Sequence, residues 1–149
     1  MAVIGATPGH LGALFERLGA AGAERSPAPG KWSARQILCH LADCEIAFAF
    51  RLRQAAAEPR HVIQPFDQDG WAAVYGSGQL DTAAALETYS VLRKWNVKFL
   101  HSVPPGTLTK AVNHPERGDM TFQSIVETMA GHDLNHLQQI ERIASTPAL

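Results

Sequence analysis

Two histidines, His132 and His136, stand four residues apart in a segment with the apolar period of a helix. In an α-helix this spacing leaves the two side chains ~40° apart around the axis and ~6 Å apart along it. Both occupy an apolar stripe that should face a core, so both imidazoles need polar partners once they are buried. One metal ion would satisfy both rings, and the pair therefore indicates a divalent-metal site.

His40 is the third candidate ligand. It lies three residues after Ile37 and four before Cys44, at the edge of the inward face of another helical segment. Three imidazoles from two facing helices, plus a water, make an open site of the catalytic kind, whereas structural zinc sites usually close with four protein ligands. The alternative is that these histidines are hydrogen-bonded core residues without a metal. We predict His40, His132 and His136 as the metal ligands.

Two acidic residues flank these histidines. Asp43 follows His40 by three residues on the same helix face, and Asp133 directly follows His132. The HDLNH segment differs from the HExxH pattern of zinc proteases because Asp133 is one carbon shorter than the catalytic Glu, so a protease is not predicted. Asp43 could be a fourth ligand, an acceptor for an imidazole N–H or a charge on the helix face, and of these we predict the acceptor. For Asp133 we keep that role, a place in a helix–helix seam and an exposed position as alternatives.

Four segments carry the helical period, and breakers separate them. They cover residues 8–21, 33–58, 82–102 and 121–145. Side-chain caps are predicted at their starts: Thr7, Ser33 with Gln36 as a capping box, Asp81 and Thr121. No strand pattern extends over more than a few residues. The sequence therefore predicts an all-α protein, a four-helix bundle.

Two connections complete the predicted fold. Residues 59–80 form a connection long enough to cross the bundle, so that two neighbouring helices can run parallel, and one helical turn is predicted at 71–75. Residues 108–120 form either a short hairpin or an irregular loop. The other histidines, His10, His61, His101 and His114, fall in or near loops and helix ends, where we expect exposed or capping side chains.

Composition limits the classes of protein that remain. The 149 residues suit one domain over 1–149, and the net charge of −1 with a pI of about 6.6 argues against nucleic-acid binding. No apolar run reaches the length of a membrane span, and residues 1–6 lack signal-peptide character. Cys39 and Cys44 would lie ~140° apart on one helix and cannot pair there. Free thiols favour a cytoplasmic location.

Several motifs resemble the DinB/YfiT-like superfamily of proposed metalloenzymes. Residues 31–33 (KWS), 36–38 (QIL) and 40–43 (HLAD) are similar to its second-helix motif, and 121–122 (TF) with 131–140 (GHDLNHLQQI) to its fourth-helix motif. The loop segments 65–67 (PFD) and 114–115 (HP) with Gly118 are similar to its loops. The resemblance covers nearly the whole chain, and His40, His132 and His136 match the family's metal ligands in order.

The resemblance implies an up-down-down-up bundle with a long crossover between the second and third helices. It also implies a divalent metal, zinc or nickel, and a homodimer. Characterised relatives act with low-molecular-weight thiols, so we expect a metal-dependent thiol S-transferase that acts on a small molecule. A metal-dependent hydrolase and a non-catalytic, metal-stabilised dimeric bundle are the alternatives. The reacting group would be a metal-bound water or thiolate, and no further catalytic residue is assigned.

Overall fold

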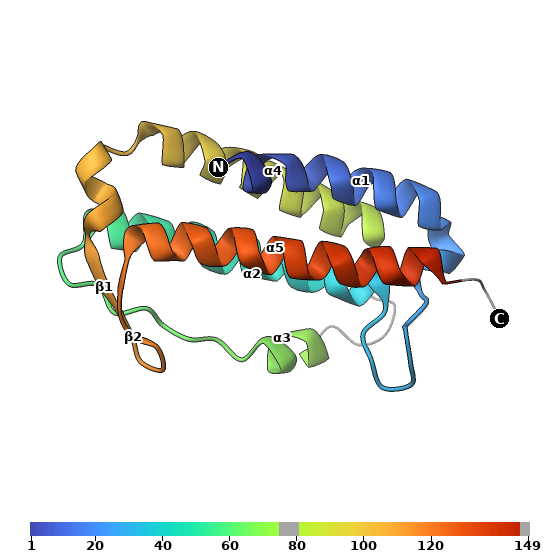
Figure 1. Cartoon of the computed structure of the whole chain (residues 1–149). Helices are drawn as coiled ribbons and strands as arrows, with labels where there is room; N and C mark the ends of the chain where they lie inside the picture. The colour runs from blue at the N-terminus through green and yellow to red at the C-terminus, as the bar shows by residue number, and fades with distance from the viewer. Residues whose placement is uncertain (75–80, 147–149) are drawn as a thin grey trace.

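A computed structural model describes residues 1–74 and 81–146 of the chain, and four long helices dominate this part (Figure 1). None of the helices within it has the length and apolar character needed to cross a membrane. The helices of the bundle are α1 (Ala2–Ala23), α2 (Ala34–Ala57), α4 (Thr82–Ser102) and α5 (Phe122–Ser145). The smaller elements are α3 (Gln68–Val74), the 3₁₀ turn η1 (Pro105–Thr109), β1 (Ala111–His114) and β2 (Gly118–Thr121).

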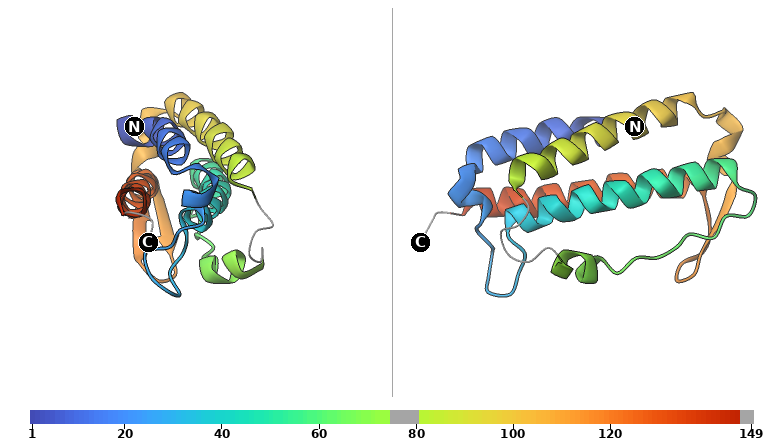
Figure 2. Two further views of the ribbon diagram at one scale, coloured as in Figure 1. Left: turned by 90° about the vertical axis from the view of Figure 1, so that its right-hand side faces the viewer. Right: turned by 180° about the vertical axis from the view of Figure 1, so that it is seen from behind.

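The helix directions confirm the predicted up-down-down-up topology. Helices α1 and α5 run one way, and α2 and α4 run the other way (Figure 1). Each of α1 and α2 packs against both α4 and α5, so α1 and α2 occupy opposite corners of the bundle. The neighbours α2 and α4 can run parallel because residues 58–74, including α3, return along the outside of α2 (Figure 2).

Three of the four predicted caps are confirmed. The Ser33 and Gln36 residues form a reciprocal capping box, in which Ser33 N–H donates to Gln36 Oε1 at 2.8 Å and Gln36 N–H donates to Ser33 Oγ at 3.2 Å. Asp81 accepts from the N–H of Ala84 at 2.6 Å, and Thr121 from that of Ser124 at 3.2 Å. These side chains satisfy backbone donors that have no partner within their own helix.

The predicted start of the first helix is wrong. Helix α1 begins at Ala2 and contains Pro8, which has no N–H to donate to the carbonyl of Ile4. The Nη1 of Arg93 in α4 donates to that carbonyl at 3.0 Å, which replaces the missing helix bond. Thr7 therefore lies inside the helix and not at its cap, with its hydroxyl 2.8 Å from Asp133 Oδ2.

Of the two alternatives predicted for residues 108–120, the hairpin is confirmed. Strands β1 and β2 pair antiparallel, from Ala111 opposite Thr121 to His114 opposite Gly118. Gly118 has a φ of 76°, a left-handed conformation that suits glycine at the end of the turn. The hairpin closes one end of the bundle and delivers the chain to the Thr121 cap of α5 (Figure 1).

A buried ion-pair network joins the four long helices. Arg93 is 1% exposed, and its guanidinium donates to both oxygens of Asp133 in α5 and to Glu45 Oε2 in α2, the last at 2.7 Å. Tyr89 O–H donates to Asp133 Oδ1 at 3.1 Å, and Asn96 Nδ2 donates to Glu45 Oε1 at 2.7 Å. Buried charges persist only when they are paired and hydrogen-bonded, as these are.

We predict that Arg93→Met strongly destabilises the fold. The substitution leaves the Asp133 and Glu45 carboxylates buried without their cation, and breaking such a pair costs about 3–5 kcal/mol. Urea unfolding measures the loss. Lys94→Met, at the exposed neighbouring position of α4, is the matched control and should change the free energy of unfolding by less than about 0.5 kcal/mol. Equal losses for the two variants would show that the network does not stabilise the bundle.

Candidate metal centre

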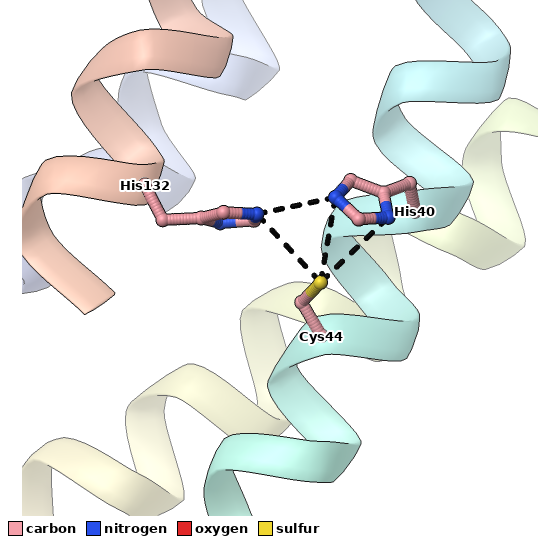
Figure 3. A group of neighbouring side chains, drawn as sticks. All are labelled: His40, Cys44 and His132. Atoms are coloured by element: carbon pink, nitrogen blue, oxygen red, sulfur yellow. Dashed lines mark hydrogen bonds between the residues drawn. The ribbon is translucent and has the colours of Figure 1, made fainter. Parts of the chain in front are cut away.

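Two histidines on facing helices converge in the interior of the bundle. His40 of α2 and His132 of α5 lie with their Nε2 atoms 3.1 Å apart (Figure 3). Cys44 is one helical turn after His40, and its Sγ lies 3.4 Å from His40 Nε2 and 3.7 Å from His132 Nε2. His40 and Cys44 are 3% and 5% exposed, and His132 is partly buried. The three side chains form one compact group of donor atoms.

His136 completes a cluster of three imidazole rings. Its ring centroid lies 4.4 Å from that of His132 and 4.9 Å from that of His40. Its Nδ1 is 2.9 Å from Gln139 Oε1. An amide oxygen only accepts, so this contact places the ring proton on Nδ1 and leaves the Nε2 lone pair free for another partner. A ring held in this way is oriented as metal-binding histidines usually are.

Burial keeps these imidazoles neutral. Desolvation, together with the neighbouring His136, lowers the pKa of His40 to about 4. Desolvation, the other two histidines and Arg93 lower the pKa of His132 to about 3. The pKa of His136 is lowered as well, chiefly by burial. Neutral imidazole is the form that binds metal, so the fold presents these residues in the required state.

The donor atoms fit a divalent ion. Zinc binds imidazole nitrogen at ~2.0–2.1 Å, so two such nitrogens in a tetrahedral sphere lie ~3.3 Å apart. The observed separation of 3.1 Å between the Nε2 atoms of His40 and His132 is close to that value. Imidazole ligands suit zinc, copper, iron and nickel, so the donor set favours a transition metal over magnesium or calcium.

A cavity of about 630 Å³ borders the cluster. His136 and Gln139 form part of its wall, and Trp32 and Ile37 add apolar surface. The Trp32 ring also lies 4.9 Å from the ring of His40, so it contacts both the cavity and the histidine cluster. The volume is in the range of small-molecule sites, and the cavity gives the cluster a candidate binding pocket.

The two aspartates that flank the histidines have different surroundings in the structure. Asp43 is buried on α2, three residues after His40. Its predicted role as an acceptor for an imidazole N–H stays a prediction. Asp133 is bound by Arg93, Tyr89 and Thr7, which lie on α4 and α1. Of the roles predicted for Asp133, the structure supports the helix–helix seam and contradicts the exposed position. The interpretation of Asp133 as a hydrogen-bond acceptor for a ligand imidazole stays a prediction.

The remaining histidines lie outside the cluster. His10 and His101 are exposed as expected, and His114 is half-buried in β1. For His61 the structure contradicts the exposed alternative of that expectation, because the residue is only 6% exposed. Its carbonyl accepts from the N–H of Asn113 at 2.9 Å, so a long-range backbone contact to the hairpin draws this loop residue inward.

Cys44 is the residue of the cluster that the sequence interpretation missed. Its place one turn after His40 also suits the apolar stripe of its helix, where free cysteine is common. The available signal was its spacing from His40, four residues, which equals the spacing of His132 from His136. In the structure the thiol is buried, and burial raises its pKa to about 12.

Fold and side chains together define a four-helix-bundle protein with a histidine-lined candidate metal centre. The family model described as DinB superfamily matches residues 5–140. The chain belongs to the DinB superfamily, as its motifs predicted.

Individual relatives support the same assignment. A protein of Oceanobacillus iheyensis is 31% identical over 111 residues, and one of Bacillus mycoides is 30% identical over 111 residues; both are named “Putative metal-dependent hydrolase”. Each alignment covers 74% of this chain and 64% of the relative. The chain thus matches somewhat less than two thirds of the length of these relatives.

A solved structure confirms the fold. YfiT from Bacillus subtilis superimposes with a TM-score of 0.88 at 20% identity, over 96% of this chain and 82% of that one. It is described as “a probable metal-dependent hydrolase with an unusual four-helix bundle topology”. At this identity the likeness establishes the bundle topology.

We predict that the metal-free protein loses stability as the pH falls from about 6.5 towards 4. Unfolded imidazoles take up protons near pH ~6.5, whereas folded His40 and His132, with pKa values of about 4 and about 3, do not. The unfolded state then binds more protons, so the free energy of unfolding decreases as the pH falls. Urea unfolding of chelator-treated protein at pH 7.5, 6.0 and 5.0 measures the slope.

His132→Gln isolates this effect from other titrating groups. We expect a shallower pH slope for this variant than for the wild type, because one buried imidazole no longer contributes. His101→Gln, at an exposed position on α4, should keep the wild-type slope. Identical slopes for His132→Gln and the wild type would contradict the buried, neutral state of His132.

Proposed function

We propose that His40, His132 and His136 bind one divalent metal ion and that the chain is a metal-dependent hydrolase of small molecules. The observation that carries the proposal is the convergence of three imidazoles, two buried and one partly buried, beside a cavity of about 630 Å³. Uncompensated imidazoles are costly in a core, and a shared metal ion gives them a common partner. The names of the relatives support hydrolysis as the reaction.

Each part of the site has a defined task in this proposal. A bound divalent ion would lower the pKa of water to ~7 and so supply a nucleophile at neutral pH. Gln139 accepts from His136 Nδ1, which leaves the Nε2 lone pair of His136 available for a metal ion. Trp32 and Ile37 line the cavity with apolar surface that excludes bulk water from the substrate. Lys31 and Arg142 lie on the cavity lining with one acidic residue, Asp69, and this small excess of positive charge favours substrates with negative charge.

Thiol transfer is the second candidate. The sequence motifs favoured a thiol S-transferase with a low-molecular-weight thiol, with hydrolysis as the alternative. The names of the relatives reverse that order, so hydrolysis comes first in the proposal. The cavity next to His136 has room for a small thiol, and the choice of zinc or nickel stays a prediction.

The predicted homodimer also stays a prediction. Val91 and Trp95 lie one turn apart on α4 and are 61% and 60% exposed. Large apolar side chains of this kind are enriched at subunit interfaces. A symmetric pair of chains is the commonest closed assembly for a domain of this size.

The first prediction from this proposal concerns the ligands. His132→Ala should abolish stoichiometric binding of zinc or nickel, because it removes one of the two imidazole nitrogens that lie 3.1 Å apart at the heart of the site. Elemental analysis after dialysis against one equivalent of metal measures the content. His101→Ala, an exposed histidine on α4, is the matched control and should retain one ion per chain. A full complement of metal in His132→Ala would refute the assigned ligand set.

The second prediction concerns the reaction. A panel of ester and amide substrates, some carrying a carboxylate, should be cleaved by the metal-loaded protein and not after chelation. Re-addition of metal should restore turnover in the wild type and not in His132→Ala. The same proteins are assayed for conjugation of small thiols to electrophiles. Metal-dependent conjugation without hydrolysis would favour the transferase, and neither activity would favour a structural metal.

A further inference from the structure

We infer that Cys44 is an additional ligand of the metal centre, a thiolate donor that stands beside His40 and His132. The inference rests on the proposed metal binding and concerns a residue outside the three-histidine set. It follows from the positions of three donor atoms (Figure 3).

The donor atoms form a triangle with the dimensions of one face of a zinc tetrahedron. Zinc lies ~2.3 Å from a thiolate sulfur and ~2.0–2.1 Å from an imidazole nitrogen, so a nitrogen and a sulfur in one tetrahedral sphere are ~3.6 Å apart. Cys44 Sγ is 3.4 Å from His40 Nε2 and 3.7 Å from His132 Nε2. The third edge, between the two nitrogens, is 3.1 Å against an ideal ~3.3 Å.

The positions of these side chains follow from the helices. His40 and Cys44 are four residues apart on α2, so they lie one above the other on the same face. That face meets α5 where His132 projects towards α2 (Figure 3). Phe48, one further turn along α2, places its ring edge-on with the centroid 6.1 Å from that of His132. Little side-chain movement is therefore needed to bring the three donors onto one ion.

The other cysteine of α2 provides the comparison. Cys39 is also buried and free, but within the described residues the group that can share a metal contains His40, Cys44 and His132. Cys39 lies on a different face of the helix, because it is five residues from Cys44. The two thiols thus resemble each other in burial and differ in access to the imidazoles.

Binding of Cys44 to a metal ion exchanges the thiol proton for a sulfur–metal bond. The thiol loses its proton to solvent as the sulfur–metal bond forms, and no oxidant or reductant takes part. The thiolate lowers the net charge of the centre by one unit and makes it softer than three imidazoles alone. Such a donor set selects zinc or cobalt over magnesium or calcium. It also occupies a coordination position that a water would otherwise take.

Cobalt substitution tests the assignment directly. Apo protein is titrated with Co²⁺ under reducing, anaerobic conditions, and the near-ultraviolet spectrum is recorded together with the bound metal. We expect a thiolate-to-cobalt charge-transfer band that saturates at one equivalent. Cys44→Ser and Cys44→Ala should lack this band and bind cobalt at least about tenfold more weakly, since changing even an outer-shell partner of a ligand costs about 10–100-fold in affinity. Cys39→Ser, the matched control on the same helix, should keep both the band and the affinity.

The outcomes separate this inference from the proposed function. If the wild type binds one equivalent of cobalt without the band, or if Cys44→Ser keeps the band, Cys44 is not a ligand and the three-histidine centre stands. If the wild type binds no cobalt, both the metal centre and the role of Cys44 are refuted. Circular dichroism of each variant confirms that the helices are intact, and the serine variant preserves the side-chain volume if the alanine variant is unstable.

Discussion

The ion pairs of Arg93 are the interaction on which the rest of the bundle depends. The guanidinium lies in the core and reaches the carboxylates of Glu45 and Asp133 and the carbonyl of Ile4, which belong to three other helices. A buried cation tolerates no loss of these partners, so their positions fix the rotation of each helix about its axis. Because successive residues of a helix are ~100° apart, turning Asp133 towards α1 and α4 turns His132 towards α2. The candidate metal centre is therefore a consequence of the same network.

Local rules predict much of this fold, and long-range contacts explain where they fail. The capping side chains Ser33, Asp81 and Thr121 act within one turn of their own helices, so the sequence alone identifies them. Pro8 looks like a helix start for the same local reason. Its place inside α1 depends on Arg93, 85 residues later in the sequence, which takes over the freed carbonyl. His61 is likewise buried by a backbone bond to Asn113 that no local pattern encodes.

In the candidate metal centre, too, local sequence patterns identify some residues, and only long-range contacts reveal the others. His132 and His136 were identifiable because their spacing puts two polar rings into a stripe that must be buried, and His40 because it lies at the edge of a second such stripe. Their convergence on one point follows from the packing of α2 against α5, which the bundle topology supplies. Cys44 was not recognised because a cysteine suits an apolar stripe as well as it suits a metal centre. Only the distances from its sulfur to the imidazole nitrogens distinguish the two roles.

Tight binding of a metal ion and hydrolysis at that ion make opposite demands on the number of protein ligands. Tight binding benefits from a fourth protein donor, whereas hydrolysis needs a place for water. If His40, His132, His136 and Cys44 all bound the ion, they would supply four protein donors, and hydrolysis would need a further position for water. The cavity lies on the His136 side of the cluster, where Gln139 orients the ring, while Cys44 faces His40 and His132 from within α2. The thiolate would thus bind the ion from the interior of the bundle and leave the cavity side for water. Protein residues would then hold the metal on one side of the centre, and substrate would react on the other.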